Sequence, residues 1–156
     1  WKHVLDLQWY VKLLNPFGEG IAEAPSARSE SPSRLRLAND SDFIAWRRGY
    51  SRHNRYVMHG PFELKPVRRR AVLCEMIIGD VRAEDADFAA LAKNVRGAAY
   101  LSIALNPLDP LVSAVKNAGF RKINRTIHFV VKAFASEELV TDPERWRLFR
   151  SDIDTW

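Results

Sequence analysis

The chain has 156 residues, a formal net charge of +5 and a hydrophobic fraction of 47%. This length fits one domain, and the apolar content is sufficient for a packed core. No apolar run approaches the roughly 20 residues that a membrane-spanning helix needs, and no signal peptide is visible. A single cysteine, Cys74, excludes an internal disulfide. We therefore expect a cytoplasmic protein, and the absence of Cys/His clusters with zinc spacing predicts no metal site.

The N-terminal third divides by composition into two parts. Apolar residues at helical spacing predict an amphipathic helix and loop over residues 1–21: Val4, Leu7, Val11 and Leu14. Residues 22–37 are rich in Ser, Pro, Ala and Arg and predict a linker. Residues 38–156 then form the main domain. Because the first residue is Trp rather than Met, we also expect that the chain is a fragment or lacks its start.

Ala71–Phe120 reads as strand, helix, strand, helix. Residues 71–78 are apolar on both faces apart from Glu75, which is typical of a strand inside a covered sheet. Carboxylates precede an apolar stripe that begins at Phe88, and Gly97 is placed to end that helix. Tyr100–Leu105 is a second apolar strand, and Asp109 can cap a helix that ends at Gly119. Two strands joined through such a helix should be parallel, with a right-handed crossover.

The flanking segments carry weaker signals. Ser41 can cap a helix that bears Phe43, Trp46 and Tyr50, and Tyr56–His59 and Phe62–Leu64 read as short strands. Thr126–Phe134 alternates as a strand with one half-buried face. Pro143–Phe149 fits either a helix or an edge strand, and the sequence leaves this open.

The order of these elements, ending in NPLDPLVSAVKNAGF, resembles the second half of the GNAT N-acyltransferase fold. Upstream, DSDFIAWRRGYSRHNRY resembles a pattern found in the second, GNAT-like half of two-domain proteins of this family, and WRLFRSDIDTW is similar to their ending. The resemblance covers roughly Asp40 to Trp156. It implies an α/β fold, a GNAT-like mixed central sheet with helices on both faces, in which the strand after the crossover helix is splayed.

The resemblance also implies where an acyl-CoA would bind. Family members hold its pyrophosphate on a glycine-rich loop at a helix N-terminus. The corresponding loop here, which starts with Val81 and Arg82, contains no glycine and carries two carboxylates that would repel phosphates. The family's Tyr on the last helix is replaced by Val115, whereas Asn106 matches the Asn that touches the pantetheine arm. Asn106, Val81 and Arg82 are therefore the candidate cofactor-binding residues.

These departures predict a degenerate half of an acyltransferase, which shapes the acceptor-substrate site. Its partner would be an N-terminal acyltransferase half missing here, or a second copy of the chain. Aromatic faces beside cations suit a small-molecule acceptor that carries a sugar or an anionic group, and they define the candidate substrate-binding residues: Trp46, Arg47, Tyr50, Arg55 and Tyr56. Asp80, at the end of the central strand, and His53 are the candidate catalytic residues, and His59 and His128 could also supply a base.

Two other classes of function stay open. RRGYSRHNRY and Arg68–Arg70 interleave cations with aromatic residues, as in a surface that follows a phosphate backbone. Against this, the net charge is modest and no nucleic-acid-binding motif is present. A protein-interaction domain without catalysis is the third reading, and the aromatic N-terminal segment is its distinguishing feature.

Overall fold

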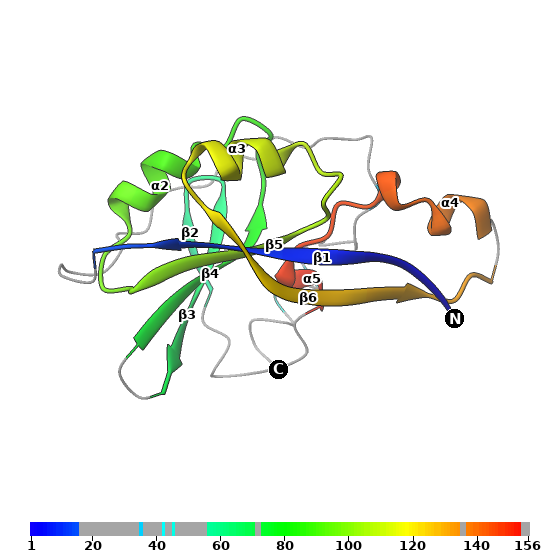
Figure 1. Ribbon diagram of the computed structural model, residues 1–156, viewed down its shortest axis with the longest axis horizontal. Helices are drawn as coiled ribbons and strands as arrows, with labels where there is room; N and C mark the ends of the chain where they lie inside the picture. The colour runs from blue at the N-terminus through cyan, green and yellow to red at the C-terminus, as the bar shows by residue number, and fades with distance from the viewer. Residues whose placement is uncertain are drawn as a thin grey trace.

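The computed structural model describes residues 1–15, 35, 42, 45, 56–70, 73–134 and 137–153. Within them the chain is mixed α/β, as predicted, and six strands form one sheet (Figure 1). The strands are β1 (Lys2–Leu13), β2 (Val57–His59), β3 (Phe62–Arg69), β4 (Leu73–Val81), β5 (Tyr100–Leu105) and β6 (Arg121–Val131). They lie in the order β2-β3-β4-β5-β1-β6. The β4–β5 pair is parallel, as predicted, and every other pair is antiparallel.

The N-terminal segment is a strand, so the prediction of an amphipathic helix is wrong. Leu5, Leu7 and Trp9 alternate with half-buried polar residues, and this period of two places them on one face of the sheet. The spacing of the other apolar residues fits a helix equally well. Pairing decides between the two patterns, because β1 hydrogen-bonds along both edges, with β5 on one side and β6 on the other. The predicted linker lies outside the described residues except for Leu35.

The two predicted helices of the central stretch are present but short. Helix α2 (Phe88–Asn94) begins after Asp87, whose carboxylate accepts hydrogen bonds from the backbone N–H groups of Ala89 and Ala90. Helix α3 (Leu111–Asn117) follows β5, and the two helices lie on the same side of the sheet (Figure 1). Gly97 and Gly119 follow these helices with φ of 72° and 84°, as expected of glycine after a helix.

The C-terminal part begins with β6, whose apolar residues alternate as predicted. Short helical turns follow: α4 (Glu137–Thr141), the 3₁₀ turn η1 (Pro143–Arg145) and α5 (Arg150–Ile153). Residues 146–149 connect η1 to α5 without helix or strand, apart from an isolated bridge between Trp146 and Leu35. The structure thus gives a single helical turn over residues 143–145 and one parallel bridge at Trp146, where the sequence left helix and edge strand open.

Apolar side chains form two clusters on opposite faces of the sheet. Ile103 and Leu105 belong to the larger cluster, which also contains the buried residues of α2 and α3. Ala104, between them in β5, belongs to the smaller cluster with Leu7 and Trp9. Neighbouring residues of a strand point to opposite faces, so each face has its own core. Among the described helices, none is long and apolar enough to cross a bilayer.

Candidate functional site

The parallel strands β4 and β5 separate before they end. They pair only at Glu75–Tyr100, Met76–Leu101 and Ile77–Ser102. Beyond these pairs β4 continues to Val81 and β5 to Leu105 without further pairing between them. The carboxyl ends of the two strands therefore border a gap in the sheet, and this is the position at which open α/β sheets commonly bind ligands.

The chain itself fills this gap with residues 146–149, which we call the closing segment. Leu148 packs in the smaller cluster with Trp9 and Ala104, and Phe149 packs in the larger cluster on the other face. Two adjacent residues of the closing segment therefore join the cores on the two faces of the sheet. Helix α5 follows directly and contacts both β4 and β5 (Figure 1).

Arg147 of the closing segment carries a buried ion network. Its Nε donates to Asp109 Oδ2 at 2.9 Å, and its NH2 group lies 3.3 Å from Asp109 Oδ1. Its NH1 group lies 3.2 Å from Glu84 Oε1. The side chains of Arg147 and Asp109 are 4% and 1% exposed, whereas that of Glu84 is 59% exposed. Glu84 belongs to the loop at which, by the resemblance, the cofactor pyrophosphate would bind. The Glu84 carboxylate forms an ion pair with Arg147.

Asn106, the candidate pantetheine contact, also holds the closing segment. Its Nδ2 donates to the carbonyl oxygens of Pro143 and Trp146 at 2.7 and 2.9 Å, and its Oδ1 accepts from the N–H of Leu108 at 3.0 Å. Asn106 has no exposed surface. Its amide therefore joins the end of β5 to the C-terminal part of the chain.

Val81, Arg82 and Asp80 lie together at the end of β4. The N–H of Val81 donates to Asp80 Oδ1 at 2.7 Å, and the N–H of Arg82 donates to the carbonyl oxygen of Pro61 at 2.8 Å. The Arg82 guanidinium lies 3.6 Å from Glu63 Oε2 and 4.0 Å from Asp80 Oδ2. Asp80 is buried, so this candidate catalytic carboxylate faces cationic and backbone groups of its own chain.

A second buried polar group surrounds Glu75 of β4. This carboxylate is 1% exposed; it accepts from Arg69 Nε at 2.7 Å and from the Ser102 hydroxyl. Burial, as the larger cause, and the negative charge of Glu75 raise the pKa of Tyr100. The hydrogen bond to Glu75 raises the pKa of Arg69. The sequence showed Glu75 only as the one polar interruption of an apolar strand, and that interruption was the signal for a buried network.

Trp9 lies close to two guanidinium groups on the same face as the smaller cluster. Arg125 and Arg150 have their central carbons 4.2 and 4.6 Å from the centre of the indole ring. Arg150 also approaches Glu75, with 3.7 Å between its NH1 group and Oε1. Cations and an aromatic ring therefore meet at Trp9, a residue that the sequence analysis did not select.

Most of the predicted acceptor site lies outside the described residues: Trp46, Arg47, Tyr50 and Arg55. The candidate catalytic residue His53 lies outside them too. Their proposed roles stay predictions. Tyr56 is described and half-buried, and the Lys65 ammonium lies 5.5 Å from the centre of its ring.

Comparison of the chain with models of protein families, with curated proteins and with solved structures finds no match.

Proposed function

We propose that this chain is a GNAT-like domain, with helices on both faces of its sheet, whose acyl-CoA cleft is closed by its own C-terminal part. In this proposal it acts as the half of an N-acyltransferase that shapes the acceptor site. The cofactor is held by another half, the N-terminal acyltransferase half that the sequence analysis expects. The main support for this proposal is that the closing segment fills the gap between β4 and β5.

The resemblance and the strand arrangement support this proposal from independent directions. The resemblance predicts a splayed strand after the crossover helix, and β5 does diverge from β4 after three residue pairs. In a stand-alone acyltransferase, the gap between the diverging strands would have to be free for acyl-CoA to enter. Here Phe149, with no exposed surface, and Leu148 occupy it.

The charges near the gap also oppose phosphate binding. Arg147 is the buried cation at this place, and two carboxylates already accept its hydrogen bonds. The loop after β4 offers Glu84 and Asp85 in place of glycine N–H groups. A pyrophosphate would have to displace an internal ion pair and then face the carboxylates that remain.

Calorimetric titration with acetyl-CoA and with CoA tests the proposal. We expect no saturable heat up to millimolar ligand. Hydrogen exchange should also be unchanged by ligand at the amides of Arg147 and Phe149, which are bonded to Leu35 O and Asp152 Oδ2. Micromolar binding with faster exchange at these two amides would refute it, because the ligand would then open the gap.

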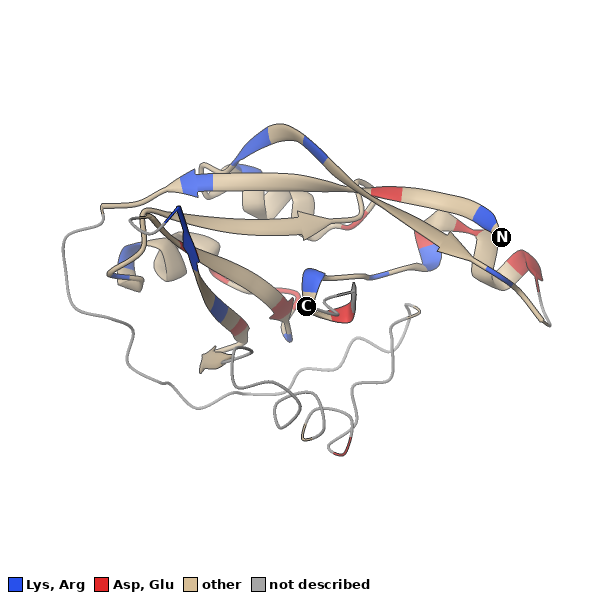
Figure 2. Cartoon of the chain, turned by 90° about the horizontal axis from the view of Figure 1, so that it is seen from below, with Lys and Arg blue, Asp and Glu red and all other residues tan. Residues whose placement is uncertain are grey.

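An anion-binding surface is the second candidate, and the start of β6 favours it. Figure 2 shows Lys and Arg along this part of the sheet. Lys116, Arg121 and Lys122 line a hollow of about 380 Å³ at the end of α3. A surface that follows nucleic-acid phosphates would lose affinity steeply with salt, with a log–log slope that grows with the number of phosphate contacts. Weak binding that does not depend on salt would exclude this candidate.

A further inference from the structure

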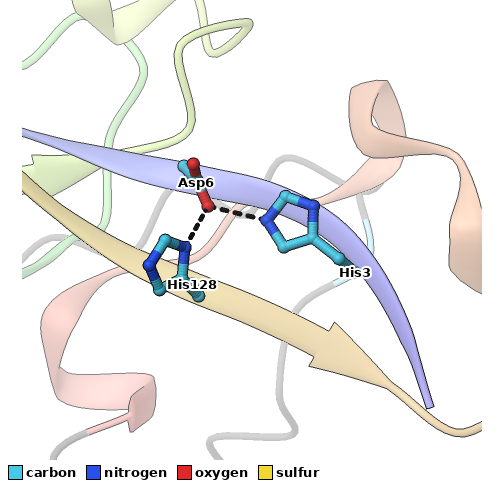
Figure 3. Close-up of side chains that lie close together, drawn as sticks. All are labelled: His3, Asp6 and His128. Carbon is cyan, nitrogen blue, oxygen red and sulfur yellow. Dashed lines mark hydrogen bonds and ion pairs between the residues drawn. The ribbon is translucent and has the colours of Figure 1, made fainter.

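Three side chains that bind metal ions well in other proteins meet on the outer part of the sheet. His3 and Asp6 belong to β1, and His128 belongs to the neighbouring edge strand β6 (Figure 3). His3 Nε2 and His128 Nδ1 each lie 2.7 Å from the same oxygen, Asp6 Oδ1. Their ligand atoms all lie within 4.8 Å of one another.

An irregularity in β1 brings the two residues of that strand to the same side. His3 and Asp6 are three apart, and in a regular strand they would point to opposite faces. Pairing with β6 shifts register between His3 and Leu5, and beyond the shift Asp6 lies directly opposite His128. A bulge of this kind redirects a side chain, and bulges are common next to functional sites.

We propose that His3, Asp6 and His128 bind a divalent transition-metal ion, with zinc as the best fit. Neutral imidazole nitrogens and a carboxylate oxygen are ordinary zinc ligands, and three protein ligands leave a fourth position for water or a further ligand. With metal–ligand bonds of about 2.0–2.1 Å, the ligand atoms of a tetrahedral site are roughly 3.3 Å apart. The two nitrogen–oxygen distances of 2.7 Å need to lengthen only slightly. The exposed imidazoles can turn to adjust the separation of the ligand atoms, which all lie within 4.8 Å of one another.

The competing explanation is a set of hydrogen bonds without metal. Such bonds between exposed groups contribute little stability in water, and they do not require two nitrogens to converge on one oxygen. A metal ion would add a firm link between β1 and β6, whose ligands are 122 residues apart in sequence. This separation is why the search for closely spaced Cys and His residues predicted no metal site.

Calorimetric titration of the full chain with Zn²⁺, after treatment with a chelator, tests the proposal. We expect one saturable site per chain. Because loss of a group that only supports a ligand already weakens metal binding about 10–100-fold, Asp6→Asn and His128→Gln should each weaken it by at least about tenfold. Asp6→Asn is the sharper variant, since the amide oxygen still accepts a hydrogen bond but is a poor zinc ligand.

His59→Gln is the matched control, because His59 lies in β2, at the opposite edge of the sheet. It should bind Zn²⁺ as the wild type does. All substituted ligand side chains are at least one-third exposed, so circular dichroism should show folded variants. Absence of saturable binding by the wild type, or equal binding by wild type and His128→Gln, would overturn the proposal.

Discussion

Arg147 offers the sharpest test of the closing segment. Arg147→Met keeps most of the side-chain volume but removes the guanidinium that faces the buried carboxylate of Asp109. Breaking a buried ion pair from one side lowers stability by about 3–5 kcal/mol. We expect about 3 kcal/mol here, at the lower end, because Asp109 still accepts a hydrogen bond from the N–H of Leu111 at 2.9 Å. Urea denaturation followed by circular dichroism measures the loss.

Two further variants separate the ion pair from packing. In Arg147→Met combined with Asp109→Asn no buried charge remains, so the double variant should be more stable than Arg147→Met alone by about 1–2 kcal/mol. Glu84→Gln is the control, because Glu84 is largely exposed and its pair with Arg147 should contribute less than about 1 kcal/mol. A loss below about 1 kcal/mol in Arg147→Met, or strict additivity in the double variant, would refute the reasoning.

Three other predictions address the core, the buried network and a turn. Phe149→Ala should lower the free energy of unfolding by about 3–5 kcal/mol and the exposed Val130→Ala by less than about 0.5 kcal/mol, both measured by urea denaturation. Glu75→Gln should lower the raised pKa of Tyr100 toward its ordinary value, because the carboxylate charge disfavours the phenolate. Absorbance titration, with Tyr100→Phe as the reference, measures this pKa, and an unchanged pKa would contradict the prediction. Gly60→Ala should reduce stability by about 1–2 kcal/mol in thermal unfolding, because φ is +56° while the space around a Cβ is open; no loss at all would contradict this.

The sequence predicted the central stretch well because its signals are local. The apolar runs of β4 and β5, the carboxylates before the apolar stripe of α2 and the glycines after the helices each depend on residues a few positions apart. The parallel direction of β4 and β5 followed from the length of the connection between them. These features required no knowledge of the rest of the chain.

The parts that the sequence did not predict depend on distant partners. Strand β1 carries apolar residues at both strand and helix spacing, and only its pairing with β5 and β6 selects the strand. The closing segment is short, and nothing in its composition indicates that it enters a gap between two other strands. Asn106 was selected as a candidate cofactor-binding residue, whereas the backbone carbonyls to which its side chain donates lie 37 and 40 residues away in sequence. Among the candidate metal ligands, His128 lies 122 residues from Asp6 in sequence.

The position of β1 has a consequence for synthesis of the protein. This strand leaves the ribosome long before β5 and β6, the two strands between which it finally lies. At about 5–20 residues per second, the roughly 90 residues between β1 and β5 correspond to a wait of roughly 5–20 s. During that time β1 exposes an apolar face and two unpaired backbone edges, which other chains could pair with. Among the described strands, β6 pairs with β1 alone. This edge of the sheet therefore forms only when β1, which is synthesised first, pairs with β6, which is synthesised last.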